Sequence, residues 1–143
     1  MLALDEVDIS GKRVVVREDF NVPMQDGQIT DDTRLKAGMH TLEYIVKQRG
    51  AAIVLSHFGR PNEGDFEAQY SLEPIASELS KLMGRPVRFA SDWIDGLEIE
   101  SGEIVLCENV RFQPGEKSND DTLAKSMAAL GDVFVNDAFA TAS

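Results

Sequence analysis

The chain has 143 residues and a formal net charge of -11, which together suit one acidic domain of ordinary size. Hydrophobic residues make up 43% of the sequence, so a core can form and the composition argues against disorder. No apolar run reaches the ~18 residues that a membrane helix needs, and the excess of acids argues against nucleic acid as a partner. A small anionic ligand is still compatible with this charge, because a few arginines in one cleft create a local positive potential.

The N-terminus and the cysteine content favour the cytoplasm. The first residues lack the basic start of a secretory signal and turn acidic at Asp5. A single cysteine, Cys107, excludes an intrachain disulfide and fits a reducing compartment. Because Cys107 ends the apolar run 104–106, we expect a buried small hydrophobic residue there rather than a reactive thiol. The sequence therefore predicts a cytoplasmic protein with no membrane partner.

The first third of the chain predicts a buried strand, a turn and a helix. The strand covers residues 14–16, and the turn that follows is tightest at Asp26-Gly27. Residues 30–33 offer several helix N-caps, and Gly50 closes the helix. The buried stripe of this helix consists of Leu35, Met39, Leu42, Ile45 and Val46.

The rest of the chain alternates between strands and helices in the same way. Residues 51–55 are apolar throughout and predict a strand buried on both faces, and Ser71 caps a second helix that Gly84 closes. The remaining elements are an edge strand at 87–89, a crossover at 91–102 anchored by Trp93 and Ile94, a strand at 104–106, a helix from about 120 to 130 and a strand at 133–135. Such alternation is typical of right-handed βαβ units. We predict an α/β fold with a doubly wound, mostly parallel, Rossmann-like sheet and helices on both faces.

Polar side chains follow four of these predicted strands, at the point where each strand ends. They are Asp19 and Asn21, His57 and Arg60, residues 108–111 with Arg111, and Asn136 with Asp137. Parallel strands bring their carboxyl ends to one edge, where α/β sheets bind ligands. We therefore expect these groups to line one rim, with Arg34 reaching in from a helix N-terminus.

The residue types on this rim suit a multiply charged small anion. An arginine presents a planar fork of donors that matches carboxylate and phosphate oxygens in pairs, and Asp19 can hold an arginine in position. The alternative is a set of ordinary surface ion pairs, each worth ~0–1 kcal/mol. For Arg34 the local pattern leaves two interpretations equally open: an ion pair with Asp31 or Asp32, or an approach to a ligand beside the helix N-terminus. Convergence on one rim favours the anion receptor.

Several other kinds of site are missing from the sequence. It has no glycine-rich phosphate loop of the G-x-x-x-x-G-K-[ST] or G-x-G-x-x-G type. It has no cluster of His and Cys residues for zinc, and we expect His40 to lie on a helix face without a ligand. The sequence therefore predicts no metal site.

Five segments of the chain, taken together, resemble one family. They are VREDFNVP at residues 16–23, SHFGRP at 56–61, YSLEP at 70–74, ENVRF at 108–112 and GDVFVNDAF at 131–139. In this order and at this spacing they are similar to the phosphoglycerate kinases, and the likeness covers essentially the whole chain. Each segment alone is a weak signal, whereas the ordered set is highly specific.

The resemblance implies a glycolytic phosphotransferase. Phosphoglycerate kinases reversibly transfer a phosphoryl group from ATP to 3-phosphoglycerate, giving ADP and 1,3-bisphosphoglycerate. They have two doubly wound domains, of which the N-terminal one binds phosphoglycerate and the C-terminal one binds Mg-ATP or Mg-ADP. The resemblance implies that residues 1–143 are an incomplete N-terminal, substrate-binding domain without the nucleotide domain, and that the full-length enzyme is a cytoplasmic monomer.

The resemblance also assigns roles to single residues of the rim. Arg34 is expected to meet the transferring phosphoryl group, and Arg111 to bind the substrate phosphate. The acceptor carboxylate is already ionised at pH 7, since its pKa is ~3–4, so no general base is needed and catalysis reduces to alignment and charge neutralisation. The substrate-binding residues that the resemblance implies are Asp19, Phe20, Asn21, Arg34, His57, Phe58, Gly59, Arg60 and Arg111.

Two departures from the family pattern stand out. Glu18 occupies a usually apolar position, and residues 140–143 read Ala-Thr-Ala-Ser where the family has Gly-Thr-Ala-His. We expect the 143-residue chain to be a fragment that binds phosphoglycerate weakly and cannot transfer phosphate by itself. The alternatives are a stand-alone anion-binding module without catalysis and a structural remnant that binds nothing.

Overall fold

The computed structural model describes residues 7–59, 61, 64–113 and 121–137 of the chain. Within them the main feature is a five-stranded sheet in the order β5-β6-β4-β1-β7, and each neighbouring pair is parallel. Its strands are β1 (Arg13–Arg17), β4 (Ala51–Leu55), β5 (Arg88–Ala90), β6 (Ile104–Cys107) and β7 (Val133–Asn136). The predicted parallel sheet is confirmed, with strand ends shifted by at most one residue, and the strand predicted near an edge, β5, is an edge strand.

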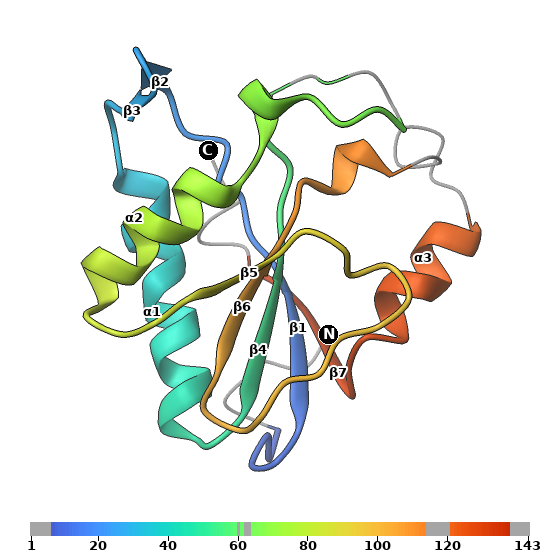
Figure 1. Cartoon of the computed structure of the whole chain (residues 1–143). Helices are drawn as coiled ribbons and strands as arrows, with labels where there is room; N and C mark the ends of the chain where they lie inside the picture. Colours follow the sequence, from blue (N-terminus) through green and yellow to red (C-terminus); the bar gives the residue numbers. More distant parts are fainter. Residues whose placement is uncertain (1–6, 60, 62–63, 114–120, 138–143) are drawn as a thin grey trace.

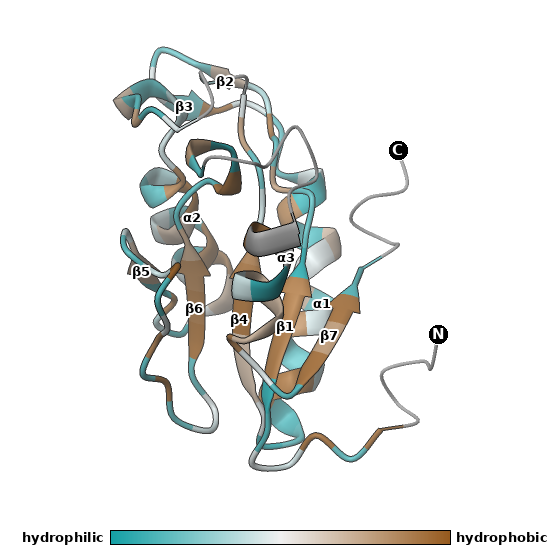
Figure 2. Ribbon diagram, turned by 90° about the vertical axis from the view of Figure 1, so that its right-hand side faces the viewer, coloured by the Kyte–Doolittle hydropathy of each residue, from teal (hydrophilic) through white to brown (hydrophobic). Residues whose placement is uncertain are grey.

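Helices cover both faces of this sheet, as predicted. One face carries α1 (Thr33–Lys47) and α2 (Glu73–Met83), and the other carries α3 (Asp121–Ala128) (Figure 1). Two hydrophobic clusters match these two layers, because the first contains Leu42 of α1 and Leu79 of α2, and Met127 of α3 packs against the second. The sheet lies between the layers. Its strands are coloured mostly as hydrophobic, in contrast to the loops around them (Figure 2).

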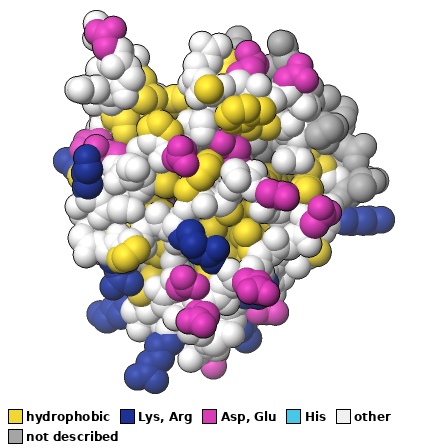
Figure 3. All heavy atoms as spheres, in the orientation of Figure 1, with side chains coloured by type: hydrophobic (Ala, Val, Ile, Leu, Met, Phe, Trp, Pro, Cys, Tyr) yellow, Lys and Arg dark blue, Asp and Glu magenta, His cyan; other side chains and the backbone are white. Residues whose placement is uncertain are grey.

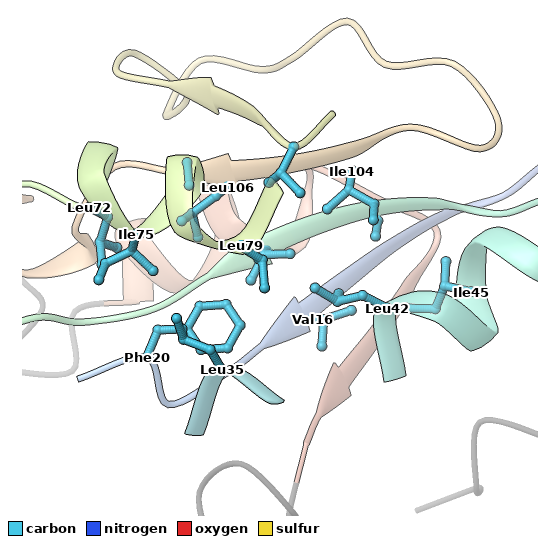
Figure 4. Packing of buried hydrophobic residues seen from close by; sticks show 14 of the residues in the cluster. Val16, Phe20, Leu35, Leu42, Ile45, Leu72, Ile75, Leu79, Ile104 and Leu106 are labelled. Carbon is cyan, nitrogen blue, oxygen red and sulfur yellow. The ribbon is translucent and has the colours of Figure 1, made fainter. Parts of the chain in front are cut away.

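Alternation along β1 divides its side chains between the two layers. Val14 and Val16 belong to the cluster under α1 and α2, and Val15 belongs to the cluster under α3. The first cluster continues past the end of the strand, where Phe20 lies beside Leu35 (Figure 4). The core therefore reaches the edge at which the strands end.

The start of α1 lies within the predicted range 30–33, whereas the start of α2 differs from the sequence prediction by one residue. The residue before α1 is Asp32, whose side chain makes no cap hydrogen bond, while Asp31 accepts hydrogen bonds from the Thr33 amide at 2.9 Å and hydroxyl at 2.6 Å. Ser71 is not the N-cap of α2, because Leu72 precedes the helix. The Ser71 hydroxyl oxygen nevertheless accepts from the Glu73 amide at 3.2 Å, and the hydroxyl also donates to a buried carboxylate described below.

The turn predicted at Asp26-Gly27 closes a small antiparallel hairpin that was not predicted. Its strands are β2 (Met24–Gln25) and β3 (Gln28–Ile29), and the turn residues have φ of 52° and 78°. Glycine accepts this left-handed conformation at no steric cost. The hairpin stands above the same sheet edge as the other strand exits (Figure 1).

Two buried side chains bear out the expectations from the sequence. Trp93 is fully buried in the crossover before β6 and donates from its indole nitrogen to the backbone oxygen of Glu108 at 3.0 Å. Cys107 is fully buried, and burial raises the pKa of its thiol to about 12, against a small opposing effect of Arg88.

Helix length and apolar content rule out a transmembrane helix in the described ranges.

Candidate functional site

The strands of the sheet end at one edge, which is the upper edge in Figure 1. The segment after β1 passes there, as do the turn after β4 and the 3-10 turn Val110–Phe112 after β6. Helix α1 begins at the same edge, so its first turn brings Arg34 to this place. The common rim predicted from parallel strands is therefore present in the fold.

The first part of the rim joins Arg34 to the segment after β1. Arg34 Nη1 donates to the backbone oxygen of Asn21 at 2.7 Å and to Asp19 Oδ1 at 3.3 Å. Asp19 Oδ1 also accepts from the Asn21 amide at 3.1 Å. The ion pair of Arg34 is thus with Asp19, and neither Asp31 nor Asp32 is its partner. The Arg34 side chain is still 36% exposed, so part of its donor fork faces solvent.

The second part of the rim joins three strand exits through Gly59. The Gly59 amide donates to Asn21 Oδ1 at 3.0 Å, and the Gly59 oxygen accepts from Arg111 Nη1 at 3.0 Å. A side chain at position 59 would overlap the ring of Tyr70. The φ of Gly59 is +63°, a left-handed value that glycine adopts without steric cost. The path Arg34–Asn21–Gly59–Arg111 therefore holds two guanidinium groups on one edge.

Asn109 fixes the turns on either side of Gly59. It is fully buried, and its Nδ2 donates to the backbone oxygens of Phe58 at 2.6 Å and Tyr70 at 2.9 Å. Its Oδ1 accepts from the amides of Phe58 at 3.3 Å and Arg111 at 3.0 Å. The sequence predicts Asn109 on the rim as a polar group of the strand exit, whereas the structure shows that it is a buried support.

Glu108 is a second buried support of the rim. Its Oε1 accepts from the amides of Leu72 at 2.8 Å and Asn109 at 2.9 Å, and its Oε2 accepts from the Ser71 hydroxyl at 2.7 Å. Ser56 acts in the same way, because its hydroxyl oxygen accepts from the Phe20 amide at 2.9 Å. These groups occupy the strand exits where ligand contacts were expected, and they hold the backbone of the rim in place.

Other residues of the predicted set differ in what they can offer a ligand. Phe20 is fully buried and Phe58 is 7% exposed, so both side chains belong to the core. Their amides are also bonded, to Ser56 and Asn109, so neither residue offers a free amide to a ligand. The sequence contained a signal for Phe20, since alternation places it opposite Asp19 and Asn21. His57 is half-buried, and Arg60 lies outside the described residues.

The fourth strand exit points inward. Asn136 is exposed, but Asp137 is 5% exposed, and its Oδ2 accepts from the Thr41 hydroxyl of α1 at 2.6 Å. The expectation that Asp137 lines the rim is therefore wrong. The reason is the β1–β7 register, which places Asp137 on the face of the sheet that α1 covers.

Glu18 is buried beside Asp137, which the sequence analysis did not foresee. It is 1% exposed, and within the described ranges neither of its carboxyl oxygens meets a hydrogen-bond donor. Burial, a hydrogen bond to the Asp137 carboxyl and the charges of Asp137 and Asp19 together raise the pKa of Glu18 to about 10. The lack of a donor near Glu18 within those ranges and its hydrogen bond to Asp137 are compatible if the Glu18 carboxyl group is itself the donor.

The exposed part of the rim carries groups of a kind that can bind an anion. Two arginines on one edge, beside the N-terminus of a 15-residue helix, suit carboxylate or phosphate oxygens. On the face in Figure 3, most Lys and Arg side chains lie in the lower half, while several Asp and Glu side chains lie near this edge. No group of three or more His, Cys, Asp or Glu residues in the described ranges could hold a metal ion.

Comparisons with known proteins give one consistent result. The family model described as phosphoglycerate kinase matches residues 4–143. The phosphoglycerate kinase of Francisella tularensis subsp. novicida (strain U112) is 55% identical over 141 residues, which is 99% of this chain and 36% of the relative. That of Legionella pneumophila (strain Paris) is 53% identical over 142 residues, with the same coverage.

Solved structures agree with the sequence relatives. The phosphoglycerate kinase of Coxiella burnetii matches with a TM-score of 0.91 and 44% identity, over 94% of this chain and 34% of that one. The enzyme of Pyrococcus horikoshii OT3 matches with a TM-score of 0.81 and 33% identity, over 99% of this chain and 38% of that one. The chain thus spans little more than a third of the length of the proteins it matches.

Proposed function

The chain belongs to the phosphoglycerate kinase family, and we propose that it is the N-terminal, phosphoglycerate-binding part of such an enzyme. The reaction is the reversible transfer of a phosphoryl group from ATP to the carboxylate of 3-phosphoglycerate. The observation that carries the proposal is the bonded path Arg34–Asn21–Gly59–Arg111, which holds two guanidinium groups on one edge. The substrate has an anionic group at each end, so two separated cations suit it.

We assign the two arginines different parts of the substrate. Arg111, held by the Gly59 oxygen, binds the phosphate that the substrate keeps throughout the reaction. Arg34, held by Asp19 beside the start of α1, neutralises charge on the phosphoryl group being transferred. The acceptor carboxylate is ionised at neutral pH, so the rim has to orient it and does not have to remove a proton. We propose that His57 and Arg60 complete the substrate contacts.

The nucleotide is a separate requirement of this chemistry. When bound, Mg-ATP supplies the phosphoryl group, but the described residues do not fit it, since they offer no metal-holding group of acids and no glycine-rich phosphate loop. We propose that residues outside this chain bind Mg-ATP or Mg-ADP, that the chain alone is inactive, and that the whole enzyme is a cytoplasmic monomer. Detectable ATP formation by the purified chain would contradict the second of these proposals.

Calorimetric titration with 3-phosphoglycerate tests the proposed site. We expect the chain to bind it, and we expect Arg34→Ala and Arg111→Ala each to weaken binding about 10- to 100-fold, the loss of one charge-assisted contact. The matched control is Arg85→Ala, which removes an exposed arginine beyond the end of α2 and should leave the affinity unchanged.

The possible results separate the three interpretations of the chain. Binding that depends on Arg34 and Arg111, together with inactivity, fits the proposed half-enzyme. Equal loss with simple phosphate and with 3-phosphoglycerate would favour a general anion-binding module. No binding by the unaltered chain, or equal affinity in all variants, would contradict the proposal.

A further inference from the structure

Three acids at the ends of β1 and β7 face one side of helix α1. The pairs are Asp19 with Arg34, Glu18 with Gly38, and Asp137 with Thr41. The three helix positions are spaced by four and three residues, so they lie in a row on one face of α1. Among these facing positions only Arg34 brings a positive charge. The other two acids therefore need another way to be stable in the interior.

The strand register explains why two of these acids are neighbours. Arg17 pairs with Asn136 at the end of the β1–β7 ladder, and the Asp137 amide donates to the Arg17 oxygen at 3.1 Å. The next residue of each strand, Glu18 and Asp137, then follows side by side. Both continue the alternation of inward-facing residues, so their side chains turn to the face that α1 covers.

The surroundings of Glu18 do not support a negative charge. The side chain is 1% exposed, and no donor in the described part of the chain reaches its oxygens. Helix α1 faces it with Gly38, where an added Cβ would lie 2.9 Å from Glu18 Oε2, and with uncharged Thr41 one turn later. The ionisable groups that act on it are Asp137 from β7 and Asp19 from its own strand exit, both acids. An ionised carboxylate in such a place is strongly unfavourable.

We propose that Glu18 is a carboxylic acid in the folded protein and donates its hydrogen to the Asp137 carboxylate, so that one shared proton fastens the ends of β1 and β7 under α1. Asp137 then accepts hydroxyl hydrogens from both Glu18 and Thr41. The pair adjoins Asp19, which holds Arg34, so it also fixes the helix that carries this arginine. The proposal stands whether or not the rim binds phosphoglycerate.

A shared proton makes the folded state sensitive to alkaline pH. The pKa of Glu18 is raised from an ordinary 4.5 to about 10 in the folded chain. The folded chain therefore holds a proton that the unfolded chain releases anywhere between these two values. The contribution of Glu18 to stability is complete below the unfolded pKa and declines as the pH rises through this window to the folded pKa.

Urea unfolding between pH 5 and pH 9 tests this linkage. We expect the unfolding equilibrium constant of the unaltered chain to rise by up to about tenfold per pH unit relative to Glu18→Gln, which cannot ionise. Glu43→Gln removes an exposed glutamate of α1 and should keep the full dependence. Equal pH dependence in the unaltered chain and in Glu18→Gln would overturn the proposal.

A spectroscopic measurement keeps the test decisive if Glu18→Gln fails to fold. Infrared spectra of the unaltered chain at pH 8 should contain the carbonyl band of a protonated carboxylic acid, and Glu43→Gln should retain it. Asp137→Asn removes the acceptor charge, so this band should disappear at a lower pH than in the unaltered chain. Absence of the band at pH 8 would contradict a protonated Glu18, and an unchanged titration in Asp137→Asn would contradict the sharing of its proton.

Discussion

Two buried glutamates at the same sheet edge have opposite surroundings. Glu108, at the end of β6, is 6% exposed and accepts three hydrogen bonds, from two amides and one hydroxyl. Glu18, at the end of β1, is 1% exposed and meets no donor in the described ranges. The difference shows that burial alone does not decide the state of a carboxyl group. The donors around Glu108 support a carboxylate, whereas the acids around Glu18 favour the protonated form.

The contrast also separates two ways of building this rim. On the β6 side, backbone amides donate to a buried carboxylate, Glu108, and to a buried side-chain amide, Asn109, and these bonds hold the backbone around Gly59 and Arg111. On the β1 side, close packing of Glu18 against Gly38 and a proposed shared proton hold the helix that carries Arg34. Substitutions in the two regions should therefore differ both in size and in their dependence on pH.

The largest effect should come from Glu108→Ala. It leaves two buried amides and a hydroxyl without acceptors, so we expect the free energy of unfolding to fall by about 3–5 kcal/mol. Chemical denaturation measures this loss, and Glu98→Ala, an exposed glutamate, should change it by less than about 0.5 kcal/mol. Similar losses for both variants would show that Glu108 does not support the rim.

A smaller loss should follow Gly38→Ala. An added Cβ would lie 2.7 Å from Phe20 Cε1 and 2.9 Å from Glu18 Oε2, so we expect destabilisation by about 1–3 kcal/mol despite the better helix propensity of alanine. Thermal unfolding checks this, with exposed His40→Ala as the control on the same helix. The loss should shrink in a Glu18→Ala background, and a stabilised Gly38→Ala would show that α1 is not tightly packed here.

Thr41→Val should cost about 1–2 kcal/mol, because it removes a hydroxyl that donates to a buried carboxylate at 2.6 Å. Thr33→Val is the matched control, since the Thr33 hydroxyl donates to Asp31 at the same 2.6 Å on the exposed surface. We expect a cost of about 0.5 kcal/mol there. Equal costs in urea unfolding would mean that the burial of Asp137 adds nothing to this bond.

The smallest effect at pH 8 should be that of Glu18→Met. Methionine has a similar volume and no proton to hold, so we expect a change within about 1 kcal/mol at pH 8 and a clearly larger loss at pH 5. The loss is expected to be larger at pH 5 because the pKa of Glu18 is raised in the folded chain. The stabilising contribution of Glu18 therefore decreases as the pH increases. A loss that is larger at pH 8 than at pH 5 would reverse the sign and contradict the account.

The sequence predicted the sheet well because its signals are local. Apolar runs such as 51–55 and the glycine that ends α2 mark elements without reference to the rest of the chain. The common rim followed from the rule that parallel strands end together, which brought Asn21 and Arg111 into one prediction. Gly59, which is bonded to both, was named only through the family resemblance. The sequence analysis expected Asp19 to be able to hold an arginine but did not name Arg34, because Asp19 and Asn21 are near it only in the folded chain.

The interior of the rim was harder to predict, since it depends on register and on neighbours far along the chain. Alternation from Val14 and Val16 would have placed Glu18 on the inner face, but nothing in the sequence pairs it with Asp137. Asn109 looked like a rim ligand because polar residues at strand ends often are. Three of its four side-chain hydrogen bonds join segments about 40 and 50 residues away, which local pattern does not specify.

A crystal structure of the chain with 3-phosphoglycerate would test the central claim most directly. The account predicts the ligand on the carboxyl edge of the sheet, with its phosphate within hydrogen-bond distance of Arg111 and its carboxylate on the side of Arg34. A ligand bound to only one of these arginines, or on another face of the molecule, would contradict it.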